Sequence, residues 1–223
     1  MNESAESGLS NAFTDLMTSL AVVFILLLCA SINNITEDIE QTRAKILKGL
    51  QVQLKEFDAR GVKVANDPKN QMSLLVLVPE GLLDFALNRS EIPSSGVSFL
   101  SLFIPKLTET LFNEEFRDAI SSVVVEGHTD SSGSDANNLA LSQRRSMAVV
   151  GKSIEILSKE ADSVENIFEK KEHFLRLLSA SGRGKQDLVV VDGKEDHQQS
   201  RRVIFKVRVK TLVERKLEKK LLH

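Results

Sequence analysis

Residues 125–133 read VEGHTDSSG, and the stretch that follows them ends in LSQRR at residues 141–145. The apolar run Val123–Val125 predicts a strand, and residues 137 to about 159 predict a helix. Asp130 then lies in the loop between them and Arg145 lies on the helix. A guanidinium group can hold a carboxylate with two parallel N–H donors, and a carboxylate can accept from an ammonium group. The stretch therefore predicts a site for a ligand that carries both groups.

The flanking sequence supplies further strands and helices. Residues 74–78 form a short apolar run that ends at Pro79-Glu80-Gly81, which predicts a strand covered on both faces. Residues 97–120 predict a helix. In residues 202–210, Val and Phe alternate with Arg and Lys, as in a strand with one buried and one wet face. The order βαβαβ predicts an α+β domain with helices packed on a small mixed sheet.

The motif resembles the OmpA-like peptidoglycan-binding family, shared by OmpA, Pal and MotB, over roughly residues 70–210. The matching pieces are VEGHTDSSG, Asn138, LSQRR and the closing QSRRV at residues 199–203. The resemblance implies that Asp130 and Arg145 anchor meso-diaminopimelate of the peptidoglycan stem peptide, with Thr129, Asn138 and Arg202 as supporting residues. Residues 158–196 depart from the family pattern, which bears on wall affinity more than on fold.

A second feature is the apolar stretch AFTDLMTSLAVVFILLLCASI at residues 12–32. At about 1.5 Å per residue it spans the ~30 Å hydrocarbon core of a bilayer, so we expect a transmembrane helix over residues 12–33. A cleaved or lipoprotein signal ending near Cys29 is the alternative. It is disfavoured because residues 1–15 carry no Lys or Arg and Leu28 is bulky. Cys29 is the single cysteine, so no intramolecular disulfide forms.

Asp15 is the one charge in this stretch. A carboxylate at the centre of a membrane-spanning helix raises the free energy of insertion by on the order of 2.5–3.5 kcal/mol, so its presence needs an explanation. Asp15 either snorkels to the headgroups, where it favours the helix dipole, or binds an ion. FTDLMT at residues 13–18 resembles the ion-carrying segment of stator B subunits of the MotB and PomB type. The resemblance implies that Asp15 binds the transported H⁺ or Na⁺, supported by Thr14, Thr18 and Ser19, with no cofactor.

The chain divides into five predicted parts. Residues 1–11 form a cytoplasmic tail, 12–33 the transmembrane helix, 34–69 a stalk helix, 70–212 the OmpA-like domain and 213–223 a helical tail. Ile35, Ile39, Ile46, Leu50 and Leu54 suit either a two-chain coiled coil or a solvated stalk. Basic residues after the span would place the C-terminus in the cytoplasm. We expect the opposite orientation, with the C-terminal domain periplasmic, because the resemblance implies a ligand outside the inner membrane.

Together the two resemblances predict a stator B subunit in the bacterial inner membrane. They imply a multi-span A subunit as partner, with two B chains inside a ring of A subunits. The missing basic N-terminal tail looks more like the ZorB family of the Zorya anti-phage motor than like flagellar MotB. A passive membrane-to-wall tether is the remaining alternative. The formal net charge of −2 does not indicate nucleic-acid binding. The motifs suggest neither catalysis nor a metal site.

Overall fold

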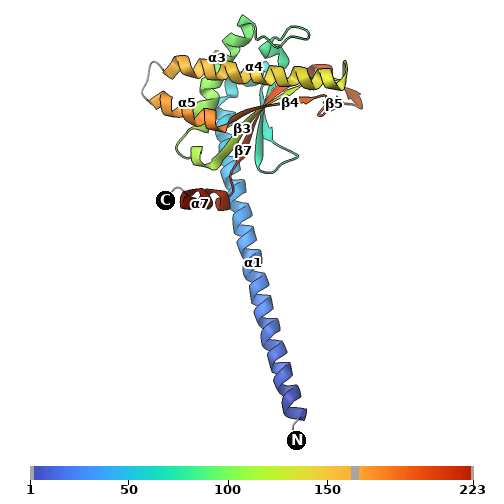
Figure 1. Cartoon of the computed structure of the whole chain (residues 1–223), viewed down its shortest axis with the longest axis vertical. Helices are drawn as coiled ribbons and strands as arrows, with labels where there is room; N and C mark the ends of the chain where they lie inside the picture. The colour runs from blue at the N-terminus through green and yellow to red at the C-terminus, as the bar shows by residue number, and fades with distance from the viewer. Residues whose placement is uncertain (1–2, 162–165, 222–223) are drawn as a thin grey trace.

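The computed structural model describes residues 3–161 and 166–221, and shows a domain at one end of a long helix (Figure 1). That helix is α1 (Glu3–Gln53). The sheet is formed by β1 (Lys63–Asn66), β2 (Ser73–Pro79), β3 (Ile120–His128), β4 (Leu178–Gly184) and β7 (Arg202–Val209). The other elements are η1 (Lys55–Arg60), α2 (Glu80–Leu83), α3 (Ser94–Leu111), η2 (Arg117–Ala119), α4 (Asp135–Ala161), α5 (Asn166–Leu177), β5 (Val190–Val191), β6 (Lys194–Glu195), α6 (His197–Ser200) and α7 (Leu212–Leu221).

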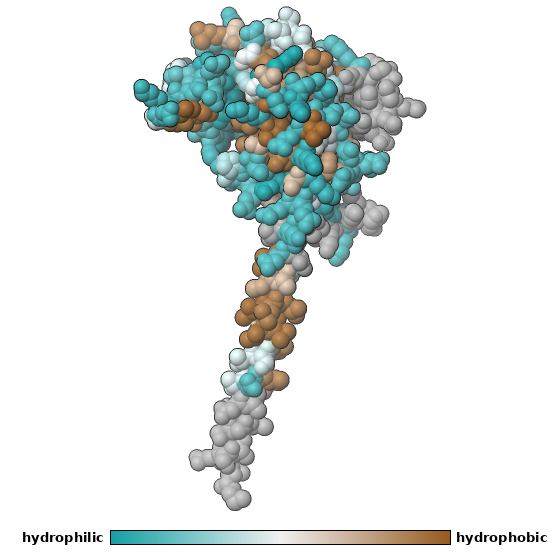
Figure 2. All heavy atoms as spheres, turned by 180° about the vertical axis from the view of Figure 1, so that it is seen from behind, coloured by the Kyte–Doolittle hydropathy of each residue, from teal (hydrophilic) through white to brown (hydrophobic). Residues whose placement is uncertain are grey.

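The N-terminal part of α1 has the length and composition of a membrane span. Residues Phe13–Asn33 have a mean hydropathy of 2.3, and none of this stretch is buried inside the protein. Figure 2 shows its brown, apolar surface below the teal surface of the domain. A helix that is apolar yet unburied needs an apolar solvent, which a bilayer provides. The expected N-terminal apolar helix is therefore present with the length and composition of a membrane span, and among the described residues it is the single candidate span.

The C-terminal part of α1 belongs to the domain and is not a separate stalk. Ile46, Leu50 and Leu54 are fully buried, and α1 packs against α3 and the sheet. Their apolar spacing therefore serves the domain core and not a coiled coil through these positions. The side chains of Ile35 and Ile39 lie outside the described residues. The boundary expected at residue 70 falls inside the hairpin of β1 and β2, because β1 already pairs with β2 from Lys63 onward.

The mixed sheet has the strand order β1-β2-β7-β3-β4, with β3 and β4 parallel and all other neighbours antiparallel. Along β7, Val203, Phe205 and Val207 are buried while Arg202 and Lys206 remain partly exposed, which confirms the predicted alternation. Phe205 contacts Phe103 of α3 at a ring-centroid distance of 5.4 Å. The core lies between this face of the sheet and helices α1, α3 and α4. The α+β class with a mixed sheet is confirmed.

Two elements differ from the sequence expectation. The helix expected over residues 97–120 ends at Leu111, because Asn113 begins a turn in which its side chain accepts from the backbone N–H of Glu115 at 3.0 Å. The chain then enters β3 already at Ile120. The edge strand β4 has the sequence LSASGRG, whose small residues carry no alternating pattern. It pairs in parallel with β3 and packs against α4, where the backbone N–H of Gly184 donates to Oγ of Ser142 at 2.9 Å.

Candidate functional site

A polar cavity of about 520 Å³ lies where β2 and β3 end and α4 begins. Its lining combines two carboxylates, two guanidinium groups, polar loop side chains and an apolar wall. The lining residues are Glu80, Phe85, Leu87, Asn88, Thr129, Asp130, Ser132, Asn138, Leu141, Arg145 and Arg201. Four residues expected at the site from the sequence, Thr129, Asp130, Asn138 and Arg145, are therefore brought together here.

Asp130 lies in the loop after β3 and is largely buried. Its Oδ2 accepts from Nη1 of Arg201 at 2.7 Å, and its Oδ1 accepts from the backbone N–H of Ser132 at 3.0 Å. Burial alone would raise the pKa of Asp130, but the hydrogen bonds from Arg201 and Ser132 outweigh it and lower the pKa. The carboxylate is therefore ionised near neutral pH and suited to a cationic group.

Arg145 reaches the cavity from α4, and its side chain is only 7% exposed. It forms an ion pair with Glu80 and donates from Nε to the carbonyl of Arg89 at 3.0 Å. Nη2 donates to the carbonyl of Ala86 at 3.4 Å, and the guanidinium carbon lies 4.8 Å from the ring centroid of Phe85. Burial lowers the pKa of Arg145 from its ordinary value, although an arginine stays charged at neutral pH. Arg145 thus also fastens the segment after β2 to α4.

Arg201 and Glu80 are the two residues that the sequence analysis missed. Arg201 Nε donates to Oε2 of Glu80 at 2.8 Å while its Nη1 contacts Asp130, so the four charges form one chain from Asp130 to Arg145. The hydrogen bond to Asp130 raises the pKa of Arg201. The available signals were the paired arginines in QSRRV and the Pro-Glu-Gly that ends an apolar strand. Neither pattern predicts which residue, distant in the sequence, the side chain of Arg201 or Glu80 contacts.

Asn138 and Thr129 shape the loop around Asp130. Nδ2 of Asn138 donates to the carbonyl of Ser132 at 2.8 Å, which holds the loop against the first turns of α4. The backbone N–H of Thr129 donates to the carbonyl of Gly184 at 2.9 Å. Within the described parts of the chain, the buried Oγ1 of Thr129 has no hydrogen-bond partner, although Thr129 lines the cavity.

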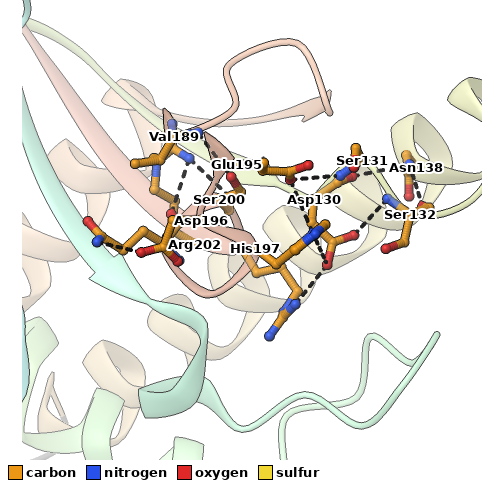
Figure 3. A network of polar contacts seen from close by, with 12 residues as sticks. Asp130, Ser131, Ser132, Asn138, Val189, Glu195, Asp196, His197, Ser200 and Arg202 are labelled. Atoms are coloured by element: carbon orange, nitrogen blue, oxygen red, sulfur yellow. Dashed lines mark hydrogen bonds and ion pairs between the residues drawn. The ribbon is translucent and has the colours of Figure 1, made fainter. Parts of the chain in front are cut away.

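Arg202, expected as a supporting residue, lies elsewhere. It points away from Asp130 (Figure 3), and its Nη2 donates to the carbonyl of Asp187 at 2.9 Å. It lines a second cavity, of about 340 Å³, on the other face of the sheet. There the Asp187 carboxylate pairs with Lys69 and Arg183, which hold its pKa at about 2. Burial lowers the pKa of Arg202 in this setting.

Gly127 lets α4 approach the strand that carries the site. A Cβ atom at this position would overlap the backbone carbonyl of Ser142, so only glycine permits the observed packing of β3 on α4. Gly133 has a different role, because its φ of +86° lies in the left-handed region and turns the loop toward α4. The two glycines thus place Asp130 and Arg145 at one cavity.

The last residues of the stretch that departs from the family pattern form the small β5–β6 hairpin, and α6 follows the hairpin beside Asp130 (Figure 3). Glu195 Oε1 accepts from the backbone N–H of Ser131 at 3.0 Å. Nδ1 of His197 lies 3.4 Å from Glu195 and 3.7 Å from Asp130. This segment therefore adds a third carboxylate and an exposed imidazole next to the predicted cation-binding residue.

Asp15 lies far from this cavity, near the beginning of the apolar part of α1. It is exposed on the isolated chain, as are Thr14, Thr18 and Ser19. The hydroxyl of Thr18 donates to the carbonyl of Thr14 at 2.7 Å, within the helix. Across the described ranges, no group of three or more His, Cys, Asp or Glu side chains could hold a metal ion.

Comparison with known proteins shows that the chain is similar to ZorB proteins. No family model matches the chain. A Zorya protein ZorB of Escherichia coli is 28% identical over 211 residues, covering 91% of this chain and 80% of that protein. The chain is similar to ZorB over nearly its whole length. A second ZorB, from another strain of the same species, is 26% identical and covers 88% of this chain and 86% of its own length. The resemblance to the ZorB family, expected from the sequence, is confirmed.

A solved structure supports the fold. The crystal structure of a MotB-like protein from Desulfovibrio vulgaris superposes with a TM-score of 0.54 at 16% identity, over 78% of this chain and 95% of that one. At this identity the likeness concerns the fold alone. It confirms the expected domain architecture, in which helices pack on a mixed sheet behind an N-terminal helix.

Proposed function

We propose that this chain is the B subunit of a stator-like motor in the bacterial inner membrane, anchored to peptidoglycan by the cavity of Asp130 and Arg145. The similarity to ZorB over 91% of the chain carries the proposal. Two features fit it independently. One end of the chain is an unburied apolar helix with a carboxylate, and the other end holds a cavity with opposite charges at separate points. We propose no catalysis, because the sequence motifs suggest no catalytic arrangement.

The wall-binding part of the proposal rests on the chemistry of the cavity. Meso-diaminopimelate carries an ammonium and a carboxylate at the end of its side chain, and these groups match Asp130 and Arg145. Thr129 lines the same cavity, and Asn138 keeps the loop in place. Arg202 has no part in this site, because it lines the other cavity. The wall-binding residues that we propose are therefore Thr129, Asp130 and Arg145, with Asn138 as a positioning residue.

The ion-carrying part of the proposal rests on Asp15. Its carboxylate lies in a helix that must cross a bilayer, and a lone charge there is costly unless a partner packs over it. A multi-span A subunit would supply that partner, and we propose two copies of this chain inside a ring of A subunits. A proton or sodium ion then binds to and leaves Asp15 as the ring moves. We place the C-terminal domain on the periplasmic side in this proposal, because peptidoglycan, the proposed ligand of the cavity, lies there.

Asp15→Asn tests the motor. In cells that carry the chain with its multi-span partner, we expect this variant to assemble with the partner yet give no protection against phage. Asp15→Glu keeps a carboxyl group and is expected to retain part of the protection. Full protection by Asp15→Asn would contradict the proposal and favour a passive tether. Co-purification of each variant with the A subunit separates loss of ion binding from loss of assembly.

The same experiment distinguishes the two motor classes. A ZorB-like subunit is expected to affect phage protection and to leave swimming motility unchanged. A flagellar stator subunit would show the reverse. We favour the defence role because the similarity to ZorB extends from the membrane helix through the whole domain.

A further inference from the structure

Both predicted anchors of the wall ligand already hold an opposite charge from the chain itself. Asp130 accepts a hydrogen bond from Nη1 of Arg201 at 2.7 Å, and Arg145 forms an ion pair with Glu80. The two occupying groups are also bonded to each other, because Nε of Arg201 donates to Glu80 at 2.8 Å. The cavity thus contains a cation on the carboxylate anchor and an anion on the guanidinium anchor, joined into one unit.

We propose that Arg201 and Glu80 are an internal stand-in for the ligand, occupying both anchors until a zwitterionic group displaces them together. This inference rests on the proposed wall-binding function of the cavity and names how that site is regulated. The ammonium of the ligand replaces Arg201 on Asp130, and its carboxylate replaces Glu80 on Arg145. No covalent step is involved, and the displaced residues keep their own ion pair.

The anchors are held more firmly than Arg201. Arg145 is 7% exposed and is fixed by two backbone carbonyls and the Phe85 ring, in addition to Glu80. Asp130 is fixed by the backbone N–H of Ser132. The Arg201 side chain, by contrast, is 39% exposed, and its hydrogen bonds go to the two carboxylates of this cluster. Arg201 is therefore close to water, whereas Arg145 is enclosed by the protein.

Charge balance also favours an exchange. The cavity lining has two carboxylates and two guanidinium groups whose charges cancel, and a neutral zwitterion leaves that sum unchanged. An isolated buried charge is costly, so a displacement that leaves one anchor without a partner is unfavourable. In the exchange, each anchor gains a new partner and the displaced pair stays matched.

The exchange affects two chemical classes of ligand differently. A terminal group with both an ammonium and a carboxylate, as in diaminopimelate, displaces both members of the stand-in. A lysine side chain has the ammonium alone and leaves Glu80 on Arg145. Both members of the stand-in therefore compete with diaminopimelate, whereas Arg201 alone competes with lysine, so the stand-in lowers the affinity for diaminopimelate more than the affinity for a lysine-type stem peptide. Glu80 is in this sense a specificity-determining residue.

Binding of soluble muropeptides to the full chain in detergent tests the stand-in. The probes are a muropeptide with diaminopimelate and a matched one with lysine, measured by calorimetry. Glu80→Gln with Arg201→Gln removes both charges of the stand-in and leaves the net charge unchanged. We expect this double variant to bind the diaminopimelate muropeptide about tenfold more tightly than the unmodified chain, since two partly exposed ion pairs no longer compete. Its preference for the diaminopimelate muropeptide over the lysine muropeptide should grow.

Three outcomes would overturn the inference. Suppose that Asp130→Asn abolishes binding while the folded double variant binds no more tightly than the unmodified chain. The proposal that Arg201 and Glu80 compete with the ligand is then wrong, whereas the proposed wall-binding site stands. If neither the unmodified chain nor the double variant binds a muropeptide, the proposed site fails and the inference with it. Should the double variant not fold, arginine side-chain NMR of the unmodified chain decides. Ligand must shift the Nη signals of Arg201, and unchanged signals at saturation contradict the exchange.

Discussion

Replacing Arg145 by lysine should destabilise the domain, because the guanidinium group holds the segment after β2 as well as lining the cavity. Lysine keeps the positive charge and can still pair with Glu80. It loses the two hydrogen bonds to the carbonyls of Arg89 and Ala86 and the flat contact with Phe85. At about 1 kcal/mol for each hydrogen bond and ~0.5–1 kcal/mol for the ring contact, the expected loss in free energy of unfolding is about 2–3 kcal/mol.

Urea unfolding of the full chain in detergent, followed by far-ultraviolet circular dichroism, measures this loss. The matched control is Arg144→Lys, since Arg144 is the exposed neighbour on the same helix and should change stability by no more than about 0.5 kcal/mol. Equal stability of the two variants would refute the reasoning. In that case the guanidinium group of Arg145 would not be what holds the segment from α2 to α3 in place.

Two further predictions concern stability. Asp187 has its pKa held at about 2 in the folded chain, against 3.8 ordinarily, so its ion pairs stabilise the fold above pH 3.8 and this contribution is lost as the pH falls toward 2. Asp187→Asn should therefore lower stability at neutral pH and make the acid part of an unfolding-against-pH curve flatter, and an unchanged curve would contradict this. Gly127→Ala should cost about 3 kcal/mol in urea unfolding because its Cβ atom overlaps the Ser142 carbonyl, whereas Gly151→Ala, on open helix surface, should be neutral or stabilising. Similar midpoints for these two alanine variants would show that α4 can move away from β3.

The anchors of the cavity were predictable from sequence because they are local. Asp130 and Arg145 lie on one strand-loop-helix unit, and the motif fixes their spacing along the chain. Arg201 lies 71 residues from Asp130 and 121 residues from Glu80. Contacts at such separations depend on the order of strands in the sheet, which no local pattern contains. The stand-in could therefore be found only from the structure.

Choosing between Arg201 and Arg202 illustrates a second limit. Adjacent residues in extended backbone point to opposite sides, so a one-residue difference decides which cavity a side chain reaches. Arg202 pairs with Pro79 and His128 as the first residue of β7, and its side chain goes to the other face. The closing motif gave the right segment, but the strand register decides the residue.

The apolar spacing of the segment after the span shows a third limit. Ile46 and Leu50 have the same helical periodicity in a coiled coil as in a helix docked on its own domain. The structure buries both in the domain core, together with Leu54. Periodicity gives the face of the helix that is buried. It does not give the partner that covers that face.

Sedimentation with purified sacculi tests the central claim most directly, namely that the cavity of Asp130 binds the cell wall. The comparison is Asp130→Asn against Asp135→Asn, because Asp135 is a nearby carboxylate whose side chain is 84% exposed and does not line the cavity. The account predicts that Asp135→Asn sediments with sacculi like the unmodified chain, while Asp130→Asn stays in the supernatant. Equal sedimentation of both folded variants would contradict it.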